Sequence, residues 1–178
     1  MSTPGQDDEP RMPVEGIDWA LPTIPVSCGA MVFDERGQLL VLKPTYKSGW
    51  TIPGGIMEAS GETPWEACQR EVLEETGLAV RSGRLVVVDT RGARHDSDDP
   101  SLDEPLGIRF LFHCGVVTEQ QKATIRLQPE EISDCRFLPV EEALDLLRKR
   151  VRRRVRAALR ADGVFLYLED GHPVDSVG

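Results

Sequence analysis

Apolar runs separated by turns rich in glycine, proline and charged residues dominate the middle of this 178-residue chain. Runs rich in valine, isoleucine and aromatic residues between such turns predict β-strands. The run at residues 39–42 has no polar side, which is typical of a strand covered on both faces. We expect strands over residues 24–33, 38–43, 84–89, 107–117 and 133–138, and a short one over 124–127.

One helix is predicted between Thr63 and Gly77. Thr63 and Glu66 form a Thr-x-x-Glu capping box, and Pro64 suits the first helical position. Gly77 supplies the left-handed residue that ends many helices. Four residues gather on the side that we assign to the core: Trp65, Cys68, Val72 and Thr76.

A second helix is expected over residues 139–147, followed by a strongly basic segment over residues 148–160. Valine and leucine recur in this segment at helical spacing, so we expect it to continue the helix as a basic amphipathic one. The simple interpretation is a solvated face whose positive charge favours the C-terminal end of the helix. The alternatives are an anionic partner, or pairing with acidic surface across a homodimer.

The order of elements predicts an α+β fold in which a mixed β-sheet lies between helices. We expect one domain over residues 21–168, preceded by a disordered acidic and proline-rich tail over residues 1–20. Residues 169–178 are expected to form a C-terminal tail.

Composition excludes several classes of protein. The formal net charge of −9 disfavours general binding to nucleic acid, because the phosphate backbone would be repelled. The four cysteines are widely spaced, which argues against a zinc site or disulfide framework and favours reduced thiols in a cytoplasmic protein. No apolar run reaches the ~18 to 20 residues of a membrane span, and the first residues lack the features of a signal peptide.

Three carboxylates share one face of the first helix, because Glu71, Glu74 and Glu75 are spaced three and four residues apart. A solvated acidic face is the simple interpretation, although each like-charge pair costs a few tenths of a kcal/mol. Two observations favour a binding site instead. The preceding Gly54-Gly55 pair allows close approach of a ligand, and no lysine lies between the glutamates. Hard oxygen ligands of this kind suit Mg²⁺ or Mn²⁺.

The region from Trp50 to Leu78 resembles the Nudix box and its usual Trp-x-x-Pro-Gly-Gly lead-in. One departure is present, because six residues separate Gly55 from Glu62 where the family pattern has five. The resemblance implies the α/β/α sandwich of Nudix domains. The matching positions are Glu62, Arg70, Glu71, Val72, Glu74, Glu75, Gly77 and Leu78.

The resemblance also implies an activity, namely Mg²⁺-dependent (or Mn²⁺-dependent) hydrolysis of a nucleoside diphosphate linked to another moiety. A nucleoside triphosphate and a nucleotide sugar such as ADP-ribose are both reasonable substrates. The alternative is a catalytically silent Nudix-fold module that binds a nucleotide or regulates a partner, which the intact glutamate set disfavours.

Roles for individual residues follow from the same resemblance. The catalytic set would be Arg70 with Glu71, Glu74 and Glu75, and the three glutamates would bind the metal together with the Gly55 carbonyl. Arg70 would pair with Glu62 and support the loop against the helix. The general base would come from the box helix, as Glu71, or from a later loop, as Glu130 or Glu131.

Candidate substrate contacts lie in two loops outside the box. The first contains Lys43 and Lys47. The second is a long polar loop after the third predicted strand, of a length typical of functional segments. Its candidate residues are Arg91, Arg94 and His95.

Overall fold

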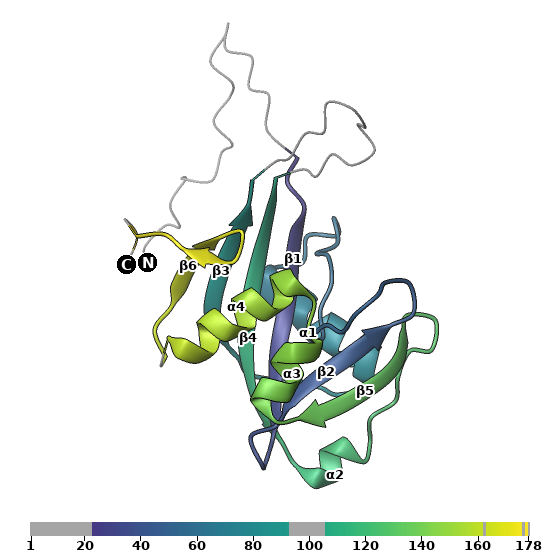
Figure 1. The fold of residues 1–178 in the computed structure, drawn as a ribbon. Helices are drawn as coiled ribbons and strands as arrows, with labels where there is room; N and C mark the ends of the chain where they lie inside the picture. Colours follow the sequence, from purple (N-terminus) through teal and green to yellow (C-terminus); the bar gives the residue numbers. More distant parts are fainter. Residues whose placement is uncertain (1–22, 93–105, 162, 176, 178) are drawn as a thin grey trace, which may run out of the picture.

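The computed structural model describes residues 23–92, 106–161, 163–175 and 177 (Figure 1). The tail predicted over residues 1–20, and the candidate contacts Arg94 and His95, lie outside these residues. The elements in chain order are β1 (Val26–Asp34), β2 (Leu39–Pro44), α1 (Pro64–Thr76), β3 (Arg84–Arg91), β4 (Gly107–Val117), α2 (Glu119–Lys122), β5 (Ile132–Leu138), α3 (Val140–Leu146), α4 (Lys149–Arg160), β6 (Leu166–Glu169) and β7 (His172–Pro173).

A seven-stranded sheet forms the centre of the domain, with strand order β5-β2-β1-β4-β3-β6-β7. Strand β1 runs parallel to β4 and β3 runs parallel to β6, whereas the other neighbours are antiparallel. Helix α1 covers one face of this mixed sheet, and α3 and α4 cover the other (Figure 1). The predicted α+β sandwich is therefore confirmed.

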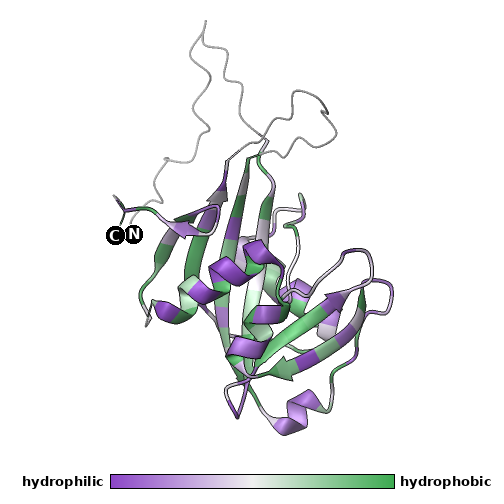
Figure 2. Cartoon of the chain, viewed as in Figure 1, coloured by the Kyte–Doolittle hydropathy of each residue, from purple (hydrophilic) through white to green (hydrophobic). Residues whose placement is uncertain are grey.

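Strand β2 shows why the sheet needs helices on both sides. Its four apolar residues are completely buried, and they alternate between two core clusters. Leu40 and Leu42 pack in the cluster beneath α1, and Leu39 and Val41 pack in the cluster beneath α3 and α4. Figure 2 shows the same arrangement, with hydrophobic strands enclosed by helices whose outer surfaces are hydrophilic.

The short strand predicted over residues 124–127 is wrong. The amide of Arg126 instead donates to the carbonyl of Thr76, which closes the end of α1 rather than a strand ladder (2.9 Å). The preceding residues form a helical turn that was not predicted, α2. It begins at a second capping box, in which Thr118 and Gln121 bond each other's amides.

The basic segment forms a separate helix, so the expectation that it continues the preceding helix is wrong. Leu147 and Arg148 are extended, and they separate α3 from α4. Trp50 bonds to both sides of this break, because its amide donates to the carbonyl of Leu146 at the end of α3 (3.4 Å) and its carbonyl accepts the amide of Arg148 (3.0 Å). The stretch before the Gly-Gly pair is thereby attached to the joint between the two helices.

The sheet continues beyond residue 168, where the sequence suggested the end of the domain. Strand β6 pairs with β3 and then turns into β7, which packs against α4. Part of the expected C-terminal tail therefore belongs to the sheet. Within the described ranges, no helix combines the length and apolar character that a membrane crossing requires.

The loop before α1 is attached to the first strand through its backbone. The Ala30 amide donates to the carbonyl of Pro53 (2.8 Å), and the Cys28 amide donates to that of Gly55 (2.9 Å). Gly54 has φ of 140°, and a Cβ atom there would lie 2.3 Å from the Cys28 carbonyl oxygen. A side chain at this position would thus meet backbone that cannot move aside.

Replacing Gly54 by alanine should therefore destabilise the fold by about 3 kcal/mol or more, through overpacking together with backbone strain. Gly61 provides the control, since it also has positive φ (94°) but a Cβ there would meet no atom within 4 Å. Gly61→Ala should cost only about 1–2 kcal/mol. Chemical denaturation of the two variants measures the difference, and equal losses would contradict the close contact.

Candidate active site

Helix α1 is positioned by local signals at both ends. The Thr63 hydroxyl accepts the amide of Glu66, and the Glu66 carboxylate accepts the amide of Thr63 (2.7 Å). Gly77 is left-handed, with φ of 74°, and donates its amide to Leu73. The predicted capping box and helix end are both confirmed. The core side is also confirmed, since the following residues are buried or pack against the core: Trp65, Cys68, Val72 and Thr76.

The three glutamates on the other side of α1 differ in their access to solvent. Glu75 is 4% exposed, the Glu71 side chain is 13% exposed, and that of Glu74 is 49% exposed. Among the described residues, the Glu75 carboxylate accepts one hydrogen bond, which the Gly54 amide donates to Oε2 (2.8 Å). The loop therefore meets the helix at its most deeply buried carboxylate.

Burial changes the acidity of this cluster. It raises the pKa of Glu75 to about 8, against the effect of the Gly54 hydrogen bond, and the charges of Glu71 and Glu131 add to the increase. Burial likewise raises the pKa of Glu71, although Arg70 opposes the change. Desolvation and like charge both disfavour the ionised carboxylates, so the cluster would be stabilised by added positive charge.

Arg70 is the cation that the site already contains. Its Nε and Nη2 bind both oxygens of Glu62, at 3.1 and 3.0 Å. Its Nη1 bridges Glu71 (3.0 Å) and Glu74 (2.9 Å), and its Nη2 also donates to the Ile56 carbonyl (3.2 Å). The Arg70–Glu62 pair suggested by the family resemblance is present. Arg70 therefore ties the loop to the helix and orients two of the three glutamates.

Gly55 lies directly against the carboxylates despite the longer loop. A Cβ atom at Gly55 would lie 2.3 Å from Oε1 of Glu71, so any other residue here would displace the Glu71 carboxylate from its observed position. The Gly55 carbonyl accepts the Cys28 amide and points toward β1. A carbonyl oxygen has two lone pairs, so the Gly55 oxygen could bind a metal ion with one of them while it accepts the Cys28 hydrogen bond with the other.

A cleft of about 850 Å³ runs past this cluster. It brings together many of the residues that the sequence suggested: Lys47, Gly55, Arg70, Glu71, Glu74, Glu75, Arg91 and Glu131. Lys43 and Glu130 do not line it. Glu130 is adjacent to Glu131, but it is exposed, and its carbonyl accepts a hydrogen bond from the Thr45 hydroxyl (2.8 Å). Of the two later-loop glutamates, Glu131 is the one beside the cluster.

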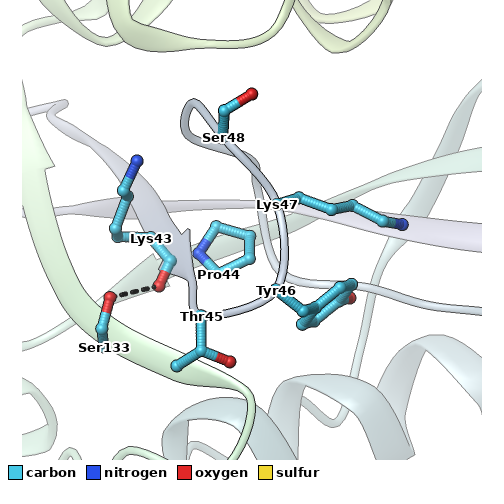
Figure 3. Close-up of a pocket in the computed structure, with 7 residues that line it drawn as sticks. All are labelled: Lys43, Pro44, Thr45, Tyr46, Lys47, Ser48 and Ser133. Carbon is cyan, nitrogen blue, oxygen red and sulfur yellow. Dashed lines mark hydrogen bonds between the residues drawn. The ribbon is translucent and has the colours of Figure 1, made fainter.

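Lys43 belongs to a separate, shallow pocket of about 590 Å³ formed with the loop over residues 44–48 and Ser133. Figure 3 shows that the side chains of Lys43 and Lys47 point in different directions. The Lys43 ammonium lies near the Gly49 carbonyl (3.5 Å), and that of Lys47 lies over the Tyr46 ring. The two ammonium groups therefore have different partners, although both lysines line this pocket.

The opposite end of the cleft is basic, and sequence reasoning missed most of it. It is lined by Arg91, Arg109, Arg148, Lys149, Arg150 and Arg154, which come from β3, β4 and the start of α4. The solvated-face interpretation of the basic segment is thus incomplete, because the Arg154 side chain is only 14% exposed. A signal was available in Arg109, a lone cation within the apolar run of β4.

The donor set at the acidic end fits a hard divalent cation. Glu71, Glu74, Glu75 and Glu131 outnumber Arg70, and two of them are desolvated carboxylates whose mutual repulsion a cation would relieve. No three His, Cys, Asp or Glu side chains in the described part of the chain form a ready-made metal cluster. The carboxylates would therefore have to approach one another to surround an ion.

Replacing Arg70 by alanine should lower the melting temperature by roughly 4–8 °C, because three carboxylates lose a partly buried partner. Arg126→Ala provides the control, since Arg126 bonds only its neighbour's carbonyl through its side chain among the described residues and should change the melting temperature little. Differential scanning fluorimetry measures both, and an unchanged melting temperature for Arg70→Ala would exclude the supporting role.

Glu75 should make the metal-free protein less stable at high pH. Its folded pKa of about 8 lies above the ordinary glutamate value of 4.5. Its contribution to stability is therefore fully present below pH 4.5 and is lost as the pH rises through 8. In EDTA, Glu75→Gln should match wild type at pH 5 and melt several degrees higher at pH 9. The exposed-site control Glu142→Gln should keep the wild-type dependence, and a Glu75→Gln curve parallel to wild type would contradict the burial effect.

Comparison with known proteins agrees with this geometry. The family model described as NUDIX domain matches residues 23–159. A MutT-like protein of Streptomyces ambofaciens is 31% identical over 118 residues, which cover 61% of this chain and 67% of the relative. The matched region spans about two thirds of the length of this relative and of two other curated relatives, and less of several others.

Two solved structures share the fold. The MutT protein from Methanosarcina mazei Go1 is 23% identical, with a TM-score of 0.62 over 79% of this chain and 96% of that one. The NUDIX domain of Shewanella oneidensis NrtR, solved with ADP ribose, is 15% identical, with a TM-score of 0.61 over 84% and 95%. The family model covers more than half of the sequence, and the glutamate helix and the sandwich lie where the resemblance implied them, so this chain belongs to the NUDIX family.

Proposed function

We propose that this protein hydrolyses a diphosphate linkage in a nucleotide derivative, in the presence of Mg²⁺ or Mn²⁺. The observation that carries the proposal is the gathering of Glu71, Glu74, Glu75 and Glu131 on one side of an 850 Å³ cleft. Membership of the NUDIX family supports the reaction class. A cleft of this size suits a ligand of nucleotide size.

The three helix glutamates would hold the cation, and the Gly55 carbonyl is a further candidate ligand. The bound ion would offset the charge of the diphosphate and lower the pKa of a water molecule. Arg70 fixes the orientation of Glu71 and Glu74 through its bridging Nη1. The Gly54 amide fixes Glu75 in the same way. Both contacts are supporting interactions of the kind that set ligand geometry.

Two glutamates compete for the role of general base. Glu71 lies on the helix beside Gly55, and Glu131 approaches from the loop before β5. We favour Glu131, because Arg70 already pairs with Glu71 whereas Glu131 forms no ion pair among the described residues. Glu130 is the less suitable later-loop candidate, since it does not line the cleft.

The substrate class that we propose is a nucleoside triphosphate or a nucleotide sugar such as ADP-ribose. Two structural relatives support a nucleoside diphosphate derivative, since one was solved in complex with ADP ribose and another is described as a UDP-X diphosphatase. Lys47 and Arg91 line the cleft and are the substrate contacts that remain from the sequence-based list.

The test is a panel of nucleoside triphosphates, nucleotide sugars and dinucleotides, assayed for release of phosphate or nucleoside monophosphate with Mg²⁺ and with Mn²⁺. Glu74→Gln and Glu71→Gln should each lower turnover at least about 100-fold, because each removes a charged metal ligand, and both should keep the wild-type fold. Glu142→Gln, on the exposed surface of α3, is the matched control and should retain activity.

Titration calorimetry with Mg²⁺ and a nucleotide analogue separates the two classes of function. Nucleotide binding without turnover of any panel member would identify the silent binding module. Near-normal metal-dependent turnover by both glutamate variants would remove the metal assignment.

A further inference from the structure

The basic end of the cleft contains several arginines to which the proposed reaction assigns no role. Its side chains come from β3, from β4 and from the start of α4, and α4 lies on the face of the sheet opposite to α1. Arginines that converge in a partly closed cleft suit phosphate, because the guanidinium fork matches phosphate oxygens. The relevant question is whether protein carboxylates already neutralise them.

Arg154 is neutralised within the protein. Its Nη1 lies 3.0 Å from Oδ2 of Asp89, a carboxylate that is 1% exposed. The other Asp89 oxygen accepts the amide of Gly171 (2.8 Å). Both oxygens of Asp89 are therefore engaged, and Arg154 is held in place by a buried partner.

Arg109 has no such partner in the described part of the chain. It stands opposite Asp89 in the β3–β4 pairing, but no ion pair or hydrogen bond joins the two side chains. Burial, together with the charges of Arg154 and Arg91, lowers the pKa of Arg109 to about 10, and the charge of Asp89 opposes this change only in part. A half-buried cation among like charges is unfavourable without a complementary anion.

Arg148 gives an independent observation at the same end. Its Nε is buried and has no hydrogen-bond partner among the described residues, a rare condition for a polar atom. Arg148 also precedes the first turn of α4, where no side chain caps the helix and its amides favour an anion. Arg109 on β4 and Arg148 at the start of the 12-residue helix α4 thus each favour binding of an anion.

We propose that Arg109 and Arg148, with Arg154 held beside them, form a phosphate-binding subsite at the basic end of the cleft. The proposal rests on the proposed function, in that the natural substrate would carry a phosphate group in addition to the diphosphate held at the acidic end. Such substrates form a defined class, namely nucleotide derivatives that bear a peripheral phosphate.

Binding of inorganic tripolyphosphate in EDTA tests the subsite without catalysis. With no divalent ion present, the acidic end repels the anion, so calorimetry reports on the basic end alone. Arg109→Gln should weaken binding at least tenfold. Arg160→Gln is the matched control, because it removes the same charge from the exposed last turn of α4, and it should change affinity less than twofold.

Two results would overturn the proposal, namely no binding by wild type or equal binding by wild type and Arg109→Gln. Loss of a repelled cation should leave the melting temperature of Arg109→Gln at or above that of wild type. Arg148→Gln provides a second variant, also with a tenfold loss expected, should Arg109→Gln fail to fold.

Matched substrate pairs connect the subsite to the reaction. Suitable pairs are ADP-ribose with its 2′-phosphate, and dephospho-coenzyme A with coenzyme A. Wild type should prefer the phosphorylated member of at least one pair by tenfold or more in kcat/KM. The ratio should fall near one in Arg109→Gln and persist in Arg160→Gln.

Persistence of the wild-type ratio in Arg109→Gln, or no preference in either pair, would count against the role in substrate selection. Failure to hydrolyse any compound, with tripolyphosphate binding intact, would overturn the proposed function and leave the phosphate subsite.

Discussion

The contact between the Gly54-Gly55 loop and Glu75 is the constraint on which the site depends. The loop is bonded to β1 on one side through Pro53 and Gly55, and to the helix on the other through the Gly54 amide. A Cβ at Gly54 would meet the backbone of β1, and one at Gly55 would displace the Glu71 carboxylate. The buried carboxylate, the strand and the loop are therefore positioned as one unit.

This arrangement concentrates like charge at a cost in stability. A carboxylate that is 4% exposed with one hydrogen bond is unfavourable when ionised, and Arg70 compensates only part of the cluster. Proteins commonly place such destabilising charge where a ligand will neutralise it. The basic end shows the same principle with opposite sign, since Arg109 is half-buried beside other arginines.

Much of the fold and one side of the site could be predicted from the sequence, because their signals are local. The α1 capping box, the Gly77 stop and the apolar run of β2 each depend on neighbours within a few residues. The same logic was available for α2, whose Thr118-x-x-Gln121 box was overlooked. Residues 124–127 were mispredicted because the partner of Arg126, the Thr76 carbonyl, is distant in sequence.

The basic end could not be located in the same way. Composition reveals arginines over residues 148–160, but not that a break at Leu147 turns the first of them toward a cleft shared with α1. That break depends on hydrogen bonds to Trp50, about a hundred residues earlier. Likewise, the sequence shows Arg109 as a lone cation in an apolar run, but not its place opposite Asp89 in the sheet.

The attachment of Trp50 to the α3–α4 joint also limits the distance between the two ends of the cleft. The start of α4 is bonded to Trp50, and Gly55, beside the carboxylates, follows only five residues later in the chain. Five residues span at most roughly 17 Å. The backbone attachments of the two oppositely charged ends therefore cannot lie farther apart than this stretch of chain allows.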